Sequence, residues 1–213
     1  MKSKDGFLAF ILHIHPPRID QNSAGFFPTM CLGGISFFLA VCLCITGFLL
    51  MLFFEPGDPQ TALNSMITIE DVVFHGRLIR SAHYWAGQLM VITVVMHLIR
   101  VLLTGAYAPP REGNWMIGVL LLLITIILDF SGYLLIGDST ARHASSIVWG
   151  ITAEIPLLGE FLQQTLFGGN PVTIIAGLRL YFWHCIFLPF LLLAIMAWHF
   201  FRVGKDGGVK RSL

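Results

Sequence analysis

Residues 83–97 read HYWAGQLMVITVVMH, an apolar run that begins and ends with histidine. A second run of the same kind, HCIFLPFLLLAIMAWH, occupies residues 184–199. At ~1.5 Å rise per residue, helices of these lengths separate their two histidines by about 21 to 22 Å, most of a ~30 Å bilayer core. Each run therefore predicts a membrane helix that carries one histidine near each surface.

The whole chain has the composition of a membrane protein. Its 213 residues are 56% hydrophobic and only 12% charged, with a mean hydropathy of +0.78. The bilayer offers no water to backbone amides, so apolar spans must be helical. We expect one all-α domain over residues 1–213, an integral membrane four-helix bundle with additional amphipathic surface helices. The expected spans cover residues 30–54, 82–104, 115–136 and 180–201.

The basic residues predict the orientation of these spans. Of the 13 Lys and Arg residues, nine fall on the side that holds both termini and four on the other, which places both termini in the cytoplasm. The location we expect is a bacterial inner membrane or an equivalent energy-transducing membrane, with lipid and no nucleic acid as a partner. Phe7 to Ile14 is either a surface helix or a disordered tail. In the long outer loop, residues 155–162 have the spacing of an interfacial helix that forms a lid.

The histidines pair across the bundle, because the second and fourth spans run in the same direction. At ~100° per residue, offsets of 14 and 15 keep each helix's two histidines on one broad face. His83 should therefore meet His184 near the outer surface, and His97 should meet His199 near the inner one. Ionisable groups inside a membrane usually mark function, and here the competing uses are proton relay, a metal site and haem ligation. Zinc requires four ligands, whereas two imidazoles per iron suit two b haems that transfer electrons.

Glycines on the other two spans repeat one of these offsets. Gly33 and Gly47 in the first span, and Gly118 and Gly132 in the third, are each 14 residues apart. Glycine is also common where membrane helices simply pack together. We favour the interpretation that these glycines lack a side chain in order to leave space for flat macrocycles.

Four arginines are candidates to bind haem propionates, with ordinary snorkelling to the membrane surface as the alternative. Arg80 and Arg100 lie one helical turn from a histidine. The other two stand near span entrances, and they are Arg111 and Arg179.

Over nearly its whole length, the chain resembles the cytochrome b family of quinol-oxidising complexes, and specifically its short, four-span form, cytochrome b6. The stretches that carry the resemblance are LIRSAH (78–83), HLIRVLLTG (97–105), PRE (110–112), GY (132–133) and RLYFWH (179–184). The 15-residue offset in the fourth span is also similar to the b6 branch.

The resemblance implies an electron-transfer subunit that passes electrons from quinol on the outer side, through two b haems, to quinone on the inner side. It also implies partners: a Rieske iron-sulfur protein, a c-type cytochrome and a second membrane subunit that completes cytochrome b, in a dimeric complex. Residues 31–35 are similar to the segment by which cytochrome b6 carries a third haem, attached through one thioether. Cys31 is accordingly expected to hold that haem, although a cysteine at a membrane edge is otherwise inert.

The chain departs from the family over residues 134–143. Where the family has Gly-Tyr-x-Leu-Pro-Trp-Asp-Gln, this chain reads GYLLIGDS over residues 132–139, which keeps Asp138 and loses the Pro, Trp and Gln. Asp129 is an additional acid one turn before Gly132. It either accepts a quinol proton, as Asp138 also could, or reaches a neighbouring subunit or the surface.

Two other functions remain open from the sequence. One is a dihaem cytochrome b that anchors a dehydrogenase or hydrogenase in the membrane. The other is a haem-free transporter or proton channel that uses the histidines as a relay.

Overall fold

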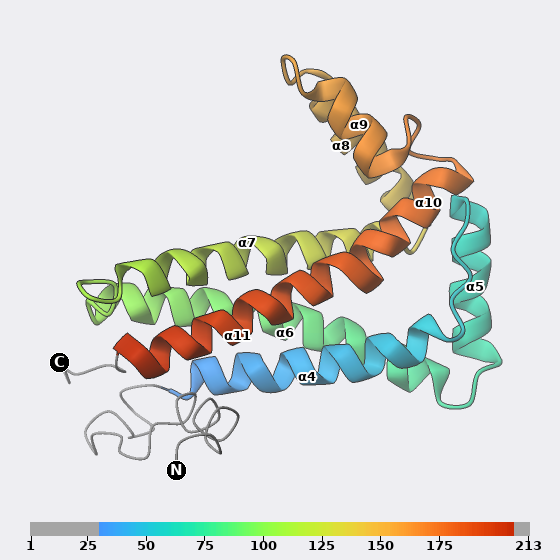
Figure 1. Cartoon of the computed structure of the whole chain (residues 1–213). Helices are drawn as coiled ribbons and strands as arrows, with labels where there is room; N and C mark the ends of the chain where they lie inside the picture. Colours follow the sequence, from blue (N-terminus) through green and yellow to red (C-terminus); the bar gives the residue numbers. More distant parts are fainter. Residues whose placement is uncertain (1–29, 207–213) are drawn as a thin grey trace, which may run out of the picture. The chain divides into compact units, whose positions relative to one another are not determined.

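The structure is a computed structural model that describes residues 30–206, and these residues form helices joined by turns. Four helical segments are long and apolar enough to cross a membrane (Figure 1). They are α4 (Leu32–Met51), α6 (Gly76–Leu103), α7 (Glu112–Leu134) and the continuous run Ile174–Lys205. The predicted all-α fold with four membrane helices is confirmed. The helix considered for residues 7–14 lies outside the described residues.

Two membrane helices begin earlier than the apolar pattern predicts. Helix α6 starts at Gly76 rather than at Ala82, because its first turns hold Arg77 and Arg80 and are too polar to register as a span. The fourth run starts with α10 (Ile174–Tyr181), where the Thr173 hydroxyl caps the helix by accepting from the Ala176 amide at 3.3 Å. A side-chain cap of this kind satisfies an amide that has no partner within the helix.

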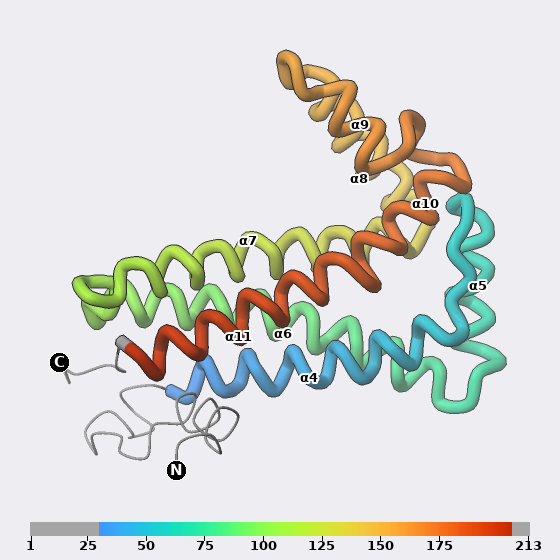
Figure 2. Tube along the Cα trace, in the orientation of Figure 1, coloured from blue at the N-terminus to red at the C-terminus, as the bar shows by residue number. Residues whose placement is uncertain are grey.

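The fourth run is irregular where it carries its first histidine. Residues Phe182–Phe187 form a π-helix, η1, before α11 (Leu188–Asp206) resumes the α-helical pattern. Figure 2 shows the chain running without interruption from α10 into α11. The Leu188 amide donates to the Trp183 carbonyl five residues earlier, and Pro189, which follows, has no amide hydrogen to donate. A π turn takes up one residue more than an α turn. This accounts for the offset of 15 in this helix against 14 in α6.

The described chain divides into two compact units. The first unit contains the residues up to Phe38, Met90–Thr125 and the residues from Leu191 onward. The second unit contains Leu39–Leu89 and Ile126–Phe190. All four long helices contribute a segment to each unit, so each unit receives two of the four histidines.

The second unit also holds three shorter helices, α5 (Pro59–Asp71), α8 (Ser139–Ala153) and α9 (Gly159–Phe167). Helix α9 packs against both α8 and α10, and its last residue, Phe167, is fully buried. It ends at Gly168, whose φ of 71° is a left-handed conformation that glycine adopts without strain.

The surface helices differ in part from the sequence prediction. The interfacial helix expected over residues 155–162 begins at Gly159 and extends to Phe167. Helix α8 was not predicted, because its residues were expected to belong to the long outer loop.

Candidate functional site

His83 and His184 face each other in the second unit. Their ring centres lie 6.3 Å apart with the rings 78° from coplanar. With ~2.0 Å from an imidazole nitrogen to a metal and roughly 1.1 Å from that nitrogen to the ring centre, two axial imidazoles on one metal place their ring centres about 6.2 Å apart. The spacing thus suits one metal atom between two imidazoles. Among residues 30–206, no three His, Cys, Asp or Glu side chains gather as a metal cluster would need.

The hydrogen bonding of His83 fixes which of its nitrogens carries the proton. Its Nδ1 lies 2.9 Å from the Thr46 hydroxyl oxygen. That hydroxyl already donates its one hydrogen to the Cys42 carbonyl at 2.7 Å, so it accepts from His83. Nδ1 therefore carries the hydrogen, and Nε2 keeps the lone pair that binds a metal.

His184 is held in the same tautomer by a different group. Its Nδ1 lies 3.1 Å from the Leu128 carbonyl oxygen, which can only accept, so Nδ1 must donate. The Ser131 hydroxyl lies 3.1 Å from the same nitrogen and itself donates to that carbonyl at 3.0 Å. Both imidazoles of the pair consequently present Nε2 as the free base.

Each of the four sequence-predicted glycines lies against one of the four histidines. A Cβ built on Gly132 would come within 2.7 Å of Cε1 of His184, and one on Gly47 within 3.0 Å of Cε1 of His83. In the first unit the corresponding distances are 3.4 Å from Gly118 to His199 and 3.6 Å from Gly33 to His97. Glycine at these positions leaves room for an imidazole ring, which is a more specific role than general helix packing.

A hollow of about 360 Å³ lies between α4 and α6 in the second unit. Small residues on either side of His83 in the α6 sequence, Ala82 and Ala86, form part of its wall, as does Thr46. Its remaining lining is Leu39, Cys42, Ile45, Trp85 and Leu89. The hollow is almost wholly apolar, and neither His83 nor His184 lines it.

The first unit contains the other two histidines, His97 on α6 and His199 on α11. Within the described residues, the Nδ1 atoms of both are buried and make no hydrogen bond, although the Asn114 backbone lies close to His199. Arg202, which the sequence analysis did not single out, packs one Nη 3.3 Å from where a Gly113 Cβ would lie. Its position one turn after His199 could have flagged it.

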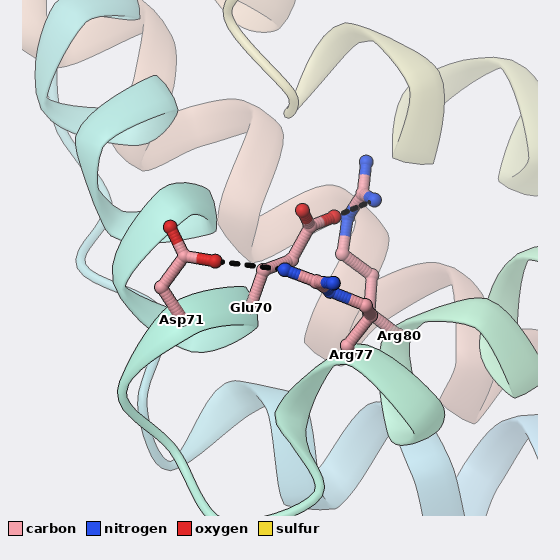
Figure 3. A network of polar contacts seen from close by, with 4 residues as sticks. All are labelled: Glu70, Asp71, Arg77 and Arg80. Atoms are coloured by element: carbon pink, nitrogen blue, oxygen red, sulfur yellow. Dashed lines mark hydrogen bonds and ion pairs between the residues drawn. The ribbon is translucent and has the colours of Figure 1, made fainter.

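The arginines expected near propionates have different surroundings. Arg80 donates to the Glu70 carboxylate of α5, a pairing that sequence reasoning missed (Figure 3). Arg179 packs near Gly168 at the end of α9, 3.3 Å from the position of a Cβ there. Arg100 and Arg111 are half-buried in the first unit.

The two candidate acids are both engaged within the second unit. Asp138 caps α8, since its carboxylate accepts from the Ala141 amide at 2.7 Å. Asp129 is half-buried on α7 and accepts from the Gln88 amide group of α6 at 2.9 Å. Gly87 allows this approach, because a Cβ there would lie only 3.4 Å from the Asp129 oxygen.

Cys31 lies directly before α4 in the first unit. Its side chain is exposed, its φ is 49°, and its carbonyl accepts from the Ile35 amide at 2.8 Å. It precedes Gly33, the residue next to His97, by two positions.

Comparisons with known proteins identify the family. The family described as Cytochrome b(N-terminal)/b6/petB matches residues 88–212. The menaquinol:cytochrome c reductase cytochrome b subunit of Geobacillus thermodenitrificans is 35% identical over 179 residues, 83% of this chain and 79% of that protein. Cytochrome b6 of Prochlorococcus marinus (strain MIT 9515) is 37% identical over 177 residues, 83% of this chain and 81% of that protein.

A solved structure, "Hyperthermophilic respiratory Complex III", contains a chain of similar fold, with a TM-score of 0.79 and 22% sequence identity. The likeness covers 95% of this chain and 54% of that one, so this chain spans about half of its length. On the sequence comparisons, the protein belongs to the cytochrome b N-terminal/b6 family.

Proposed function

We propose that this chain is the electron-transfer subunit of a quinol:cytochrome c oxidoreductase, a single cytochrome b6-type domain over residues 1–213. It passes electrons from quinol on the outer side of the membrane to quinone on the inner side. The observation that carries the proposal is the His83–His184 pair, with ring centres 6.3 Å apart and each Nδ1 tied to a neighbouring oxygen.

The residues around each histidine fit the b haem that the family implies. His83 and His184 would hold one haem as axial ligands, and His97 and His199 the other. A haem between two imidazoles supplies one-electron transfer and leaves no iron position open to a substrate. Thr46 and the Leu128 carbonyl keep two of the ligands in the binding tautomer, while the glycines leave room for the rings.

A third haem would be attached covalently through Cys31. The exposed thiol lies two residues before Gly33, which contacts His97, so a haem on Cys31 would lie next to the inner pair. Four arginines with half-buried side chains would be cations for haem propionates: Arg80, Arg100, Arg111 and Arg179.

The remaining parts of the proposal concern quinol and partners. Asp129, which lies on α7 and accepts one hydrogen bond from Gln88, would accept a proton from quinol. Asp138, just beyond the end of α7, is a second candidate acceptor. The distribution of basic residues supports the proposal that both termini lie in the cytoplasm. A Rieske protein, a c-type cytochrome and a second membrane subunit would complete a dimeric complex.

A dihaem anchor for a dehydrogenase is the second candidate, favoured by residues 134–143, where the family's Pro, Trp and Gln are missing and Asp138 serves as a helix cap. Purified complex distinguishes the two. Co-purification of a Rieske protein supports the oxidoreductase, as does reduction of the b haems that requires both quinol and an oxidant. Reduction of the b haems only by a soluble dehydrogenase supports the anchor.

Haem analysis of wild type and Cys31→Ala tests the cofactor assignment. We expect two extractable b haems per chain in both proteins, and a peroxidase-active band that survives denaturing electrophoresis only in the wild type. A band that persists in Cys31→Ala would show that the covalent haem is attached elsewhere. No b haem in purified wild type would contradict the proposed function itself.

A further inference from the structure

Two ion pairs in the second unit join the end of α5 to the beginning of α6 (Figure 3). We propose that one of them, Glu70–Arg80, sets the reduction potential of the haem at His83 and His184, with Glu70 acting as a positioning residue through Arg80. The proposal rests on the proposed function, because it requires a haem at that pair.

The two ion pairs differ in their exposure to water. The side chains of Arg77 and Asp71 are 73% and 57% exposed, and their charged atoms lie 2.9 Å apart. Arg80 and Glu70 are only 33% and 32% exposed, and Nη1 of Arg80 donates to Oε1 of Glu70. Solvent and salt screen the Arg77–Asp71 pair far more than the Arg80–Glu70 pair. The charge of Glu70 is therefore felt further into the unit than that of Asp71.

Arg80 is the link between this pair and the histidine. It precedes His83 by three residues on α6, which puts both on the same side of the helix at ~4.5 Å along its axis. A guanidinium has five N–H donors in a fixed fork, and the structure commits Nη1 to Glu70. The remaining donors are available to an anionic group at the His83 end, such as a haem carboxylate.

Electrostatics gives the direction of the effect. A cation beside the haem stabilises the added electron, and a carboxylate bound to that cation offsets part of its charge. Glu70→Gln removes the negative charge and leaves Arg80 in place, so the reduced haem becomes more stable. For one unit charge at ~10 Å and an effective dielectric constant of about 20, reduced by partial exposure, the ratio of reduced to oxidised haem rises roughly threefold to tenfold at a fixed ambient potential.

A purely structural clamp between α5 and α6 would behave differently. It would lower stability when broken, yet it would not shift a haem potential in a direction set by the sign of the charge. Charge-changing and charge-keeping variants of the same residue separate the two roles.

The experiment is a redox titration of both b haems in the full chain, purified with its haems. We expect Glu70→Gln to raise the potential of the His83–His184 haem, Arg80→Gln to lower it, and Glu70→Asp to stay close to wild type. Asp71→Asn is the matched control, since it removes the same charge one residue along, and we expect less than a twofold change in the ratio. The potential of the His97–His199 haem should not move in any variant.

Equal shifts for Glu70→Gln and Asp71→Asn, or no shift in Glu70→Gln, would overturn the proposal. If Glu70→Gln does not accumulate haem, the other two variants still test the proposal. It requires a lowered potential in Arg80→Gln and an unchanged potential in Glu70→Asp, and a raised potential in Arg80→Gln would refute it. Wild type without a bis-histidine haem would instead refute the proposed function, so the two failures are distinguishable.

Discussion

Alanine at Gly132 should displace the haem proposed at His83 and His184 without unfolding the helix that carries the glycine. The new Cβ would lie 2.7 Å from Cε1 of His184, whereas an ordinary contact needs about 3.4 Å, so the ring must retreat by roughly 0.7 Å. The ring is not free to do so, because its Nδ1 is bound to Leu128 and Ser131 at 3.1 Å. Overpacking of this kind costs ~1 to 3 kcal/mol.

At ~1.4 kcal/mol per tenfold, this cost corresponds to roughly fivefold to 150-fold weaker haem binding at the outer pair. Alanine is the better helix former by about 1 kcal/mol, so α7 itself should not be weakened. The assay is the pyridine haemochrome content and the low-spin EPR signal of purified protein, with Gly33→Ala as the matched control. A Cβ there would make an ordinary 3.6 Å contact with His97.

We expect Gly132→Ala to lose the signal of one haem, and Gly33→Ala to keep both. Gly47→Ala and Gly118→Ala, with Cβ contacts of 3.0 and 3.4 Å, should fall between them in that order. Full retention of both haems in Gly132→Ala, or equal losses in Gly132→Ala and Gly33→Ala, would refute the reasoning.

Three further predictions concern single contacts. Thr46→Val removes the hydroxyl that accepts from Nδ1 of His83 and should weaken haem binding at His83 and His184 by about 10- to 100-fold, measured by haem retention on dilution. Ser131→Ala should weaken it less, because the Leu128 carbonyl still accepts from His184. The backbone amide of Thr61, with that of Gln60, holds the pKa of Asp58 below its usual 3.8. The cap formed by the Asp58 carboxylate therefore stabilises α5 above pH 3.8, and this stabilisation is lost as the pH falls through the lowered pKa. Hydrogen exchange in α5, corrected for its intrinsic rate, should speed up on acidification in wild type and not in Asp58→Asn. Asp129→Asn should slow quinol oxidation while leaving both haem spectra unchanged, and an unchanged rate would remove Asp129 from the quinol reaction.

The membrane helices and the opposed pair His83 and His184 could be predicted because both follow from regular geometry. Long apolar runs specify spans, and parallel helices with histidines at similar depths bring His83 and His184 together. The glycine contacts were also within reach, since an offset of 14 repeats on the helices that face the histidines.

The remaining features depend on local hydrogen bonds and tertiary packing that the apolar pattern does not record. The π-helical turn at His184 lies just before Pro189, which has no amide hydrogen, and the spacing of apolar residues does not predict it. Thr46 reads as an ordinary helix residue until it is seen beside His83. The partner of Arg80 could not be predicted either, because Glu70 belongs to a different helix and the turn between them decides whether they meet.

The proposed function depends most on four histidines that hold two haems in two pairs. The most direct measurement is the number and potential of b haems in purified wild type and in His83→Leu, His184→Leu, His97→Leu and His199→Leu. We expect two b haems of different potential in wild type, loss of one and the same haem in His83→Leu and His184→Leu, and loss of the other in His97→Leu and His199→Leu. A variant pair that loses different haems, or wild type that binds none, would contradict it.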